Sequence, residues 1–222
     1  VVRQVERHFA DLGTTALIPG TPSIYGGGEF RQEKDLDQAH VVLGFPSVGY
    51  NDPDYYAALM LSLLLGGGMS SRLFQEIREK RGLVYSVYSF NAPFLDGGVF
   101  GIYAGTGEKE CAELVPVTLE ELKKVQKSVG KDELARACAQ LKASLLMSLE
   151  STGSRCEQIA RQLQLFGRLI PVAETVARVE AVTPDDICRV ATRIFTQKPT
   201  LAALGPVKHV LSLDTITENL AA

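Results

Sequence analysis

The sequence predicts an α+β fold in which a mostly antiparallel sheet carries helices packed on one face. Two stretches, Glu29–Ser47 and Leu83–Thr106, combine strand-like alternation with turn residues. Helical periodicity then runs almost without interruption from Glu108 to Phe195, and the apolar segment Pro199–Pro206 is typical of a last strand. Strands followed by a run of helices favour α+β over an alternating α/β architecture.

The composition limits the domain count and the classes of partner. At 222 residues and 45% apolar content, the chain is long enough for one substantial core. Its 23 basic and 26 acidic residues give a net charge of −3 and form no long block of one sign, which argues against nucleic-acid and membrane partners. The longest apolar run, Ala57–Leu65, is interrupted by Ser62 and is far shorter than the roughly 20 residues that span a bilayer.

The cysteines and histidines do not form a metal-binding pattern. No C-x-x-C pair occurs, and the four cysteines are widely spaced: Cys111, Cys138, Cys156 and Cys188. We expect reduced cysteines, which favours a reducing compartment such as the cytoplasm or an organelle matrix. The three histidines, His8, His40 and His209, are equally scattered. No metal is therefore expected to be bound by this chain alone.

The N-terminal segment predicts a helix, a linker and then two strands. Apolar residues recur at helical spacing within Val1–Leu12, and prolines and glycines interrupt the pattern in Ile18–Gly28. Two strands are expected around a polar turn at Lys34–Asp37. Because no initiator methionine precedes Val1, we expect a fragment or a processed product.

A buried helix is predicted within Asn51–Gly68. Asp52 has the character of an N-cap, Pro53 suits the first helical position, and the glycines at its end suit a left-handed C-cap. A second helix is expected to begin after Ser70 or Ser71 and to end at Gly82, with Leu73, Phe74 and Ile77 on its apolar face.

Strands and helices follow in turn. Leu83–Ala92 and Gly97–Thr106 predict strands joined across a turn that contains Pro93 and an Asp-Gly pair. Long helices are then expected at Lys131–Glu150 and Thr152–Leu169, and the sequence Thr-Pro-Asp-Asp from Thr183 is a strong helix start.

The glycine triplet Gly66, Gly67 and Gly68 raises the question of a phosphate-binding loop. A Walker-type loop needs a preceding strand and a Lys-Ser/Thr pair, but here a helix precedes and Met69 follows. The dinucleotide pattern G-x-G-x-x-G is also absent. We interpret the triplet as a connection between helices whose bare backbone can admit another chain.

Arg78 and Tyr85 are the candidate functional pair. Arg78 falls in the last turn of the predicted helix, Tyr85 lies in the next strand, and Gly82 makes the turn between them, so both side chains can point into one cleft. Arg78 offers a fork of donors for a peptide carbonyl and Tyr85 offers a phenolic donor. The alternative is a solvated surface arginine and a half-buried strand tyrosine. Strand alternation predicts that Tyr85 and Tyr88 lie on opposite faces.

The residues Asp52–Phe90, with Asp35–Ser47 before them and Gly97–Thr106 after them, resemble the C-terminal half of the zinc peptidases related to mitochondrial processing peptidase, pitrilysin and insulysin. The similarity covers roughly Gly26 to Pro206. The resemblance implies two related halves around a chamber, with zinc held on the first half by an inverted H-x-x-E-H motif. It also implies that Arg78 and Tyr85 act on the substrate, and that the glycine triplet lines the chamber.

The chain departs from the complete family pattern because it contains no H-x-x-E-H. The resemblance therefore implies a second half that lacks zinc, is inactive alone, and supplies substrate-binding and oxyanion-stabilising groups to an N-terminal half or a paralogous subunit. The expected division is residues 1–20 as the closing helix of the preceding half and a linker, 21–206 as the peptidase-like domain, and 207–222 as a tail. Two alternatives remain: a non-catalytic scaffold or core subunit, and a peptide-binding module.

Overall fold

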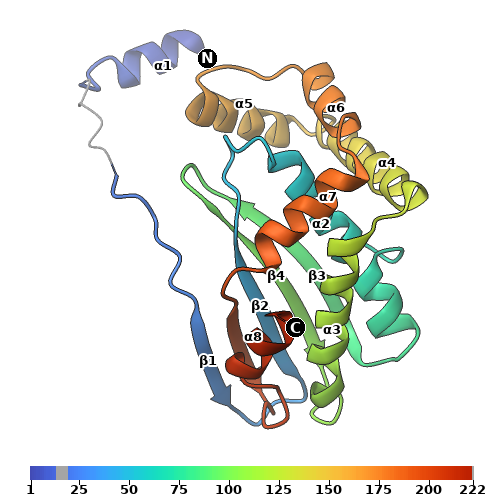
Figure 1. Ribbon diagram of the computed structural model, residues 1–222. Coiled ribbons are helices and arrows are strands. Elements are labelled where there is room, and N and C mark those ends of the chain that lie inside the picture. The colour runs from blue at the N-terminus through green and yellow to red at the C-terminus, as the bar shows by residue number, and fades with distance from the viewer. Residues whose placement is uncertain (14–19, 222) are drawn as a thin grey trace.

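The computed structural model describes residues 1–13 and 20–221. It confirms the α+β prediction: one five-stranded sheet lies behind a layer of helices (Figure 1). Part of the predicted linker, residues 14–19, falls outside the described residues. The strands are β1 (Gly28–Glu33), β2 (Ala39–Ser47), β3 (Val84–Pro93), β4 (Gly98–Thr106) and β5 (Thr200–Gly205). The helices are α1 (Val2–Phe9), α2 (Tyr55–Gly66), η1 (Phe74–Glu79), α3 (Cys111–Lys127), α4 (Lys131–Ser148), α5 (Thr152–Phe166), α6 (Val172–Glu180), α7 (Pro184–Phe195) and α8 (Leu213–Ala221).

The strand order is β1-β5-β2-β4-β3. Among the described strands only the β1–β5 pair is parallel, so the sheet is mostly antiparallel as predicted. The two strands expected around the turn at residues 34–37 both form, but they do not pair with each other. Strand β5 returns from the C-terminal part of the chain and lies between them. This long-range insertion makes β1 and β3 the two edges of the sheet.

The core lies between the sheet and the helices on one face. Burial alternates along β5, and it also alternates along β2 and β4 when their glycines are set aside, as expected for strands with one covered face. Phe195 of α7 is 1% exposed and packs edge-on against Phe45 of β2 and Phe100 of β4, with ring centroids 5.1 and 5.3 Å apart. These aromatic contacts join α7 to the centre of the sheet.

Helix α2 is buried as predicted, but both of its ends differ from expectation. The helix begins at Tyr55 with Asp54 at the N-cap, because Asp52 instead accepts a hydrogen bond from the Asp54 N–H at 2.9 Å in a preceding turn. Gly67, the C-cap, has a φ of −81°, so the predicted left-handed cap is wrong.

The two chain termini differ in their packing. Helix α1 has no buried residue and lies apart from the sheet (Figure 1). Within the segment expected to be a tail, α8 buries Leu213 and Ile216 in the main core. Residues 207–221 therefore pack as part of the domain, because the apolar face of α8 covers the sheet beside α3.

Candidate functional site

The segment that carries Arg78 is helical but winds more widely than an α-helix. Between Phe74 and Glu79 it forms a π-helix, in which the Lys80 N–H donates to the Gln75 carbonyl at 3.0 Å. Leu73 and Ile77 are fully buried and hold the segment against the core. Short π-helical segments are frequent at functional sites because they change the direction of the side chains that follow.

Arg78 is exposed at the end of this π-helix. Its guanidinium carbon lies 4.8 Å from the centre of the Phe74 ring, a cation–π contact that supports the side chain without using its N–H donors. Among the described residues Arg78 forms no ion pair, whereas its neighbours Lys80 and Arg81 both pair with Glu76. The donors of Arg78 therefore remain available to an external acceptor.

Gly82 fixes the step from helix to strand. Its φ of +65° is a conformation that favours glycine, and its N–H donates to the Arg78 carbonyl at 3.0 Å. The next residue, Leu83, donates its N–H to the Ile77 carbonyl at 2.9 Å. These bonds hold the end of the π-helix against the start of β3, so the backbone positions of Arg78 and Tyr85 are linked.

Tyr85 occupies a bulge in β3. Val84 pairs with Thr106 and Ser86 pairs with Gly105, which leaves Tyr85 as an extra residue without a partner. Tyr85 is 69% exposed and Tyr88 is 47% exposed, while Val84 and Val87 are both buried. The prediction that the two tyrosines lie on opposite faces is wrong, because the bulge absorbs one residue of the alternation. Both side chains lie on the open face of the sheet.

The glycine triplet has a packing role that its sequence did not reveal. A Cβ on Gly66 would overlap the β3 backbone and lie 2.7 Å from the Ser89 Oγ, so only glycine lets α2 approach β3 this closely. A Cβ on Gly67 would lie 2.6 Å from the Leu63 Cα. Gly68 is exposed, and a Cβ there would lie 3.4 Å from the Gln140 side chain. Of the three, only Gly68 combines exposure with room for another group.

A large hollow of about 1100 Å³ lies elsewhere, at the C-terminal end of β3. It is lined by the aromatic cluster Tyr50, Tyr55, Tyr56 and Phe166, and by residues of α4 to α7. Burial raises the pKa of Tyr55 to about 12. Arg78 and Tyr85 do not line this hollow. They lie at the other end of β3, on an exposed surface.

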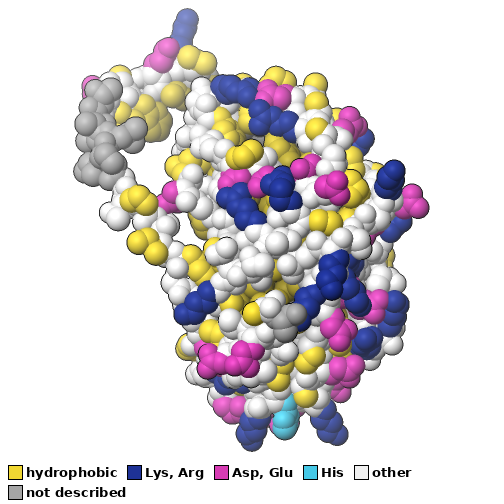
Figure 2. Space-filling view, in the orientation of Figure 1, with side chains coloured by type: hydrophobic (Ala, Val, Ile, Leu, Met, Phe, Trp, Pro, Cys, Tyr) yellow, Lys and Arg dark blue, Asp and Glu magenta, His cyan; other side chains and the backbone are white. Residues whose placement is uncertain are grey.

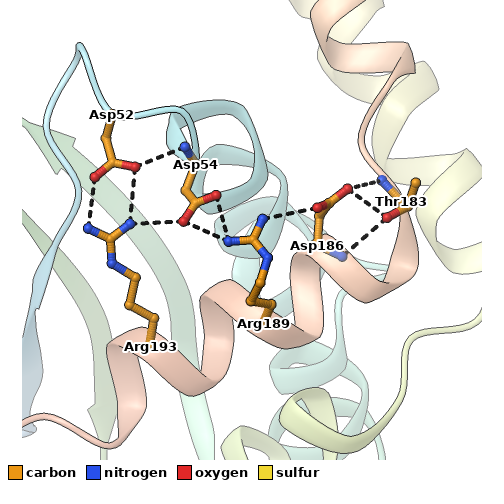
Figure 3. A network of polar contacts seen from close by, with 6 residues as sticks. All are labelled: Asp52, Asp54, Thr183, Asp186, Arg189 and Arg193. Atoms are coloured by element: carbon orange, nitrogen blue, oxygen red, sulfur yellow. Dashed lines mark hydrogen bonds and ion pairs between the residues drawn. The ribbon is translucent and has the colours of Figure 1, made fainter.

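Beside the hollow, a network of ion pairs joins α7 to the loop before α2 (Figure 3). The Arg193 guanidinium donates to Asp52 and Asp54 at 2.8 Å each, and Arg189 donates to Asp54 at 2.8 Å and to Asp186 at 3.0 Å. Thr183 and Asp186 cap α7 reciprocally, as their spacing in the sequence predicted. Basic and acidic side chains also lie next to one another over the rest of the helical layer (Figure 2).

Two carboxylates of this network, those of Asp52 and Asp186, are electrostatically stabilised. Burial alone would raise the pKa of Asp52, but hydrogen bonds from the Arg193 side chain and the Asp54 N–H hold it below its ordinary value. The pKa of Asp186 is lowered chiefly by hydrogen bonds from Thr183 and then by Arg189. The charged side chains of this network therefore pair with one another and stabilise the fold. The Arg78 guanidinium, by contrast, has no ion-pair partner among the described residues.

The described residues contain no group of three His, Cys, Asp or Glu side chains that is placed to hold a metal. His40 of β2 forms a hydrogen bond with the Tyr103 hydroxyl at 2.8 Å, while His8 lies on α1 and His209 follows β5. These donors do not fit a zinc site. The four cysteines are free thiols, with Cys111 buried and Cys156 exposed. No helix in the described part of the chain is long and apolar enough to cross a bilayer.

The sequence and the fold of this chain resemble one class of protein, the inactive halves of zinc peptidases. The profile of the family described as "Peptidase M16 inactive domain" matches residues 1–141. An uncharacterized zinc protease of Streptomyces coelicolor is 42% identical over 218 residues, which cover 94% of this chain and 48% of that protein. The beta subunit of human mitochondrial-processing peptidase is 32% identical over 227 residues, which cover 96% of this chain and 46% of the subunit.

This chain belongs to the peptidase M16 family and corresponds to its inactive C-terminal domain. It spans about half the length of the curated relatives that it matches. A chain in the structure of complex III from Candida albicans has the same fold, with a TM-score of 0.82 at 22% identity, over 90% of this chain and 50% of that one.

Proposed function

We propose that this chain is the substrate-positioning half of a zinc-dependent endopeptidase, and that it completes an active site whose zinc is held by a partner half. The observation that carries this proposal is the pair Arg78 and Tyr85. Both side chains are exposed, have no polar partner among the described residues, and are linked through the turn at Gly82. Their donors are therefore available to a substrate carbonyl.

Zinc, if bound on the partner half, would supply an activated water for attack on the peptide carbonyl. Negative charge then develops on the carbonyl oxygen. The Tyr85 hydroxyl donates a hydrogen bond to this oxygen, which stabilises the transition state more than the ground state. Arg78 donates to a neighbouring substrate carbonyl and helps to hold the peptide as an added strand along a sheet edge.

The glycine triplet has a secondary part in this proposal. Gly66 lets α2 end close to β3, Gly67 avoids a clash with Leu63 of the same helix, and Gly68 would present bare backbone at the surface of the chamber. The free thiols are consistent with a reducing compartment, the cytoplasm or an organelle matrix. The partner is an N-terminal half or a paralogous subunit, and the substrate is a peptide.

A scaffold without activity is the second candidate, because complex III also contains a chain of this fold. A scaffold has no need of an exposed, unpartnered arginine and tyrosine at the start of β3.

Reconstitution separates the two functions. The chain is mixed with the zinc-bearing half encoded upstream or as a partner, and cleavage of a quenched peptide is measured with and without a chelator.

We expect the 222-residue chain alone to retain no stoichiometric zinc after dialysis and to cleave no peptide, because the part of it that the structure describes contains no set of zinc-binding side chains. The mixture should show chelator-sensitive cleavage. An assembly that forms but never cleaves would favour the scaffold. Chelator-sensitive activity, or zinc bound by the histidines, in the pure chain would contradict the proposal.

A further inference from the structure

The hollow of about 1100 Å³ at the C-terminal end of β3 lies between the start of α2 and helices α4, α5 and α6. Helix α5 forms one wall of it although none of the residues of this helix is buried, so α5 does not fill the space against the core. Figure 1 shows α5 at the end of the molecule away from α8. Ligand sites in proteins usually have volumes of about 300–1000 Å³, so the hollow has room for a ligand of several residues.

Part of the lining of this hollow is apolar and aromatic. Leu141 and Leu145 of α4 lie on it, and so does Phe166 at the end of α5. Tyr55 and Tyr56 add two rings that meet edge-on with centroids 5.0 Å apart. Surfaces of this kind bind aliphatic and aromatic groups, so a ligand with an apolar body is favoured.

Asn91 of β3 brings a buried hydrogen-bond donor to the lining. Residue 91 is four positions after the buried Val87, so strand alternation places it on the helix-covered face of the sheet. The Ser47 hydroxyl donates to the Asn91 Oδ1 at 2.6 Å, which orients the amide. Its Nδ2 is the one buried side-chain nitrogen or oxygen among the described residues that has no hydrogen-bond partner. Buried polar groups are nearly always paired, so an acceptor from another molecule would complete its bonding.

Most charged side chains that line the hollow already have partners within the chain. The lining aspartates belong to the α7 network described above. Lys142 pairs with Glu180, and the two lining arginines at either side of the start of α6 pair with Glu174. Two charged residues of the lining have no ion-pair partner among the described residues, and both lie on α5: Arg161 and Glu157.

Arg161 lies within electrostatic reach of the Tyr55 hydroxyl. Burial and the neighbouring tyrosines raise the pKa of Tyr55 to about 12, and the positive charge of Arg161 opposes this rise. The hydroxyl is therefore protonated at neutral pH and can donate a hydrogen bond. A guanidinium and a phenol together suit a carboxylate, which accepts charge-assisted hydrogen bonds on both of its oxygens. Glu157, one turn earlier on α5, would compete only weakly for Arg161.

We propose that this hollow binds the C-terminal end of a peptide. Arg161 and Tyr55 hold the free carboxylate, the apolar lining receives an aromatic or aliphatic last side chain, and the Asn91 Nδ2 donates to a backbone carbonyl. A peptide terminus combines these three features in one ligand. The site involves neither Arg78 nor Tyr85, so the inference goes beyond the proposed function. Hydrolysis of a peptide bond creates such a carboxylate, which makes a cleavage product one source of the ligand.

The first test measures the binding of three short peptides, labelled with a fluorophore at the N-terminus, to the 222-residue chain by anisotropy. One ends in leucine and phenylalanine with a free carboxylate, the second is its C-terminal amide, and the third ends in leucine and serine with a free carboxylate. We expect the first to bind about three- to tenfold more tightly than either of the others, because the amide loses the ion pair and the serine loses the ring. Equal affinity of the acid and the amide, or no saturable binding of the first peptide, would overturn the inference.

Variants of α5 test the assignment of Arg161. Arg161→Gln should abolish the preference for the acid over the amide and leave the affinity of the amide unchanged. Arg155→Gln is the matched control, since Arg155 is an exposed arginine of the same helix that does not line the hollow. Glu157→Gln should strengthen the binding of the acid by about twofold, because it removes a competing carboxylate. An equal loss of preference in the two arginine variants would indicate general charge attraction, against the proposed site.

Asn91→Ala tests the contact with the peptide backbone. We expect it to weaken the acid and the amide alike, by about three- to tenfold, because both peptides lose the same hydrogen bond. Unchanged affinities in a folded variant would overturn this contact. Thermal melting identifies a variant that fails to fold, and the peptide comparisons on the unaltered chain stand without it.

Competition and the assembled protein establish which ligand binds and where. The small acid 3-phenylpropionate has the ring and the carboxylate without a peptide backbone, so displacement by it at concentrations equal to those of the peptide would overturn the peptide assignment. Arg78→Ala and Tyr85→Phe should leave the affinity unchanged, and a loss in either would place the peptide at the other end of β3. Loss of binding in the assembly with a zinc-bearing half would mean that this half covers the hollow, which contradicts the inference.

Discussion

The charged residues at the two ends of β3 have opposite surroundings. At its C-terminal end, the arginines of α7 share three carboxylates in the network around Asp54. At its N-terminal end, Arg78 has no ion-pair partner among the described residues and Tyr85 lies in a bulge. Intramolecular partners hold the first region together. The donors of the second region have no partner among the described residues, which is the arrangement that our proposal expects of half of an active site.

Truncating aromatic side chains should give the largest difference in the free energy of unfolding between residues of the core and residues of the candidate site. Phe195→Ala removes a ring in contact with Phe45 and Phe100 and should lower the free energy of unfolding by about 3–5 kcal/mol. Tyr85→Ala, at a 69% exposed position, should change it by no more than about 0.5 kcal/mol. Urea denaturation checks both. Equal losses would mean that Tyr85 belongs to the fold.

The glycine triplet gives the next largest effect. Gly66→Ala should destabilise the chain by about 1–3 kcal/mol, because its new Cβ meets the β3 backbone, which outweighs the better helix propensity of alanine. Gly68→Ala is the matched control, since its Cβ would make only an ordinary contact with Gln140. The two midpoints of thermal unfolding should differ clearly. If they coincide, α2 does not pack against β3 as closely as described.

A smaller effect should appear as acid sensitivity of the α7 network. The folded-state pKa of Asp52 lies below its unfolded value near 4, so this group stabilises the fold above that pH. The contribution, about 1 kcal/mol because the arginines are half exposed, is lost as pH falls through the folded pKa. Asp52→Asn should flatten the dependence of stability on pH below about 5, whereas the exposed Asp37→Asn should not. An unchanged profile in Asp52→Asn would contradict the assignment.

The features of the fold that could be predicted from the sequence are those that depend on interactions between residues close together in the chain. The reciprocal cap at Thr183, the buried face of α2 and the turn at Gly82 each depend on residues close together in the chain, and all are present. The insertion of β5 between β1 and β2 depends on a pairing of residues more than 150 positions apart, which periodicity does not encode.

The candidate site was only partly predictable for the same reason. Arg78, Gly82 and Tyr85 could be chosen from their residue types and their resemblance to a family. The π-helix and the bulge each insert one extra residue into a regular pattern, and the local composition does not predict either of them. Because of the bulge, Tyr85 and Tyr88 lie on the same face of the sheet, whereas strand alternation predicted opposite faces. The close approach at Gly66 likewise requires knowledge of which strand lies against α2.

The most direct test of the central claim is the turnover of Tyr85→Phe in the assembly with a zinc-bearing half. We predict a fall in kcat on the order of 10²–10³, as expected for loss of one oxyanion donor, with an almost unchanged melting temperature. Tyr50→Phe, which removes a hydroxyl at the opposite end of β3, should retain full turnover. Undiminished turnover in Tyr85→Phe would contradict the claim that this chain supplies the oxyanion donor.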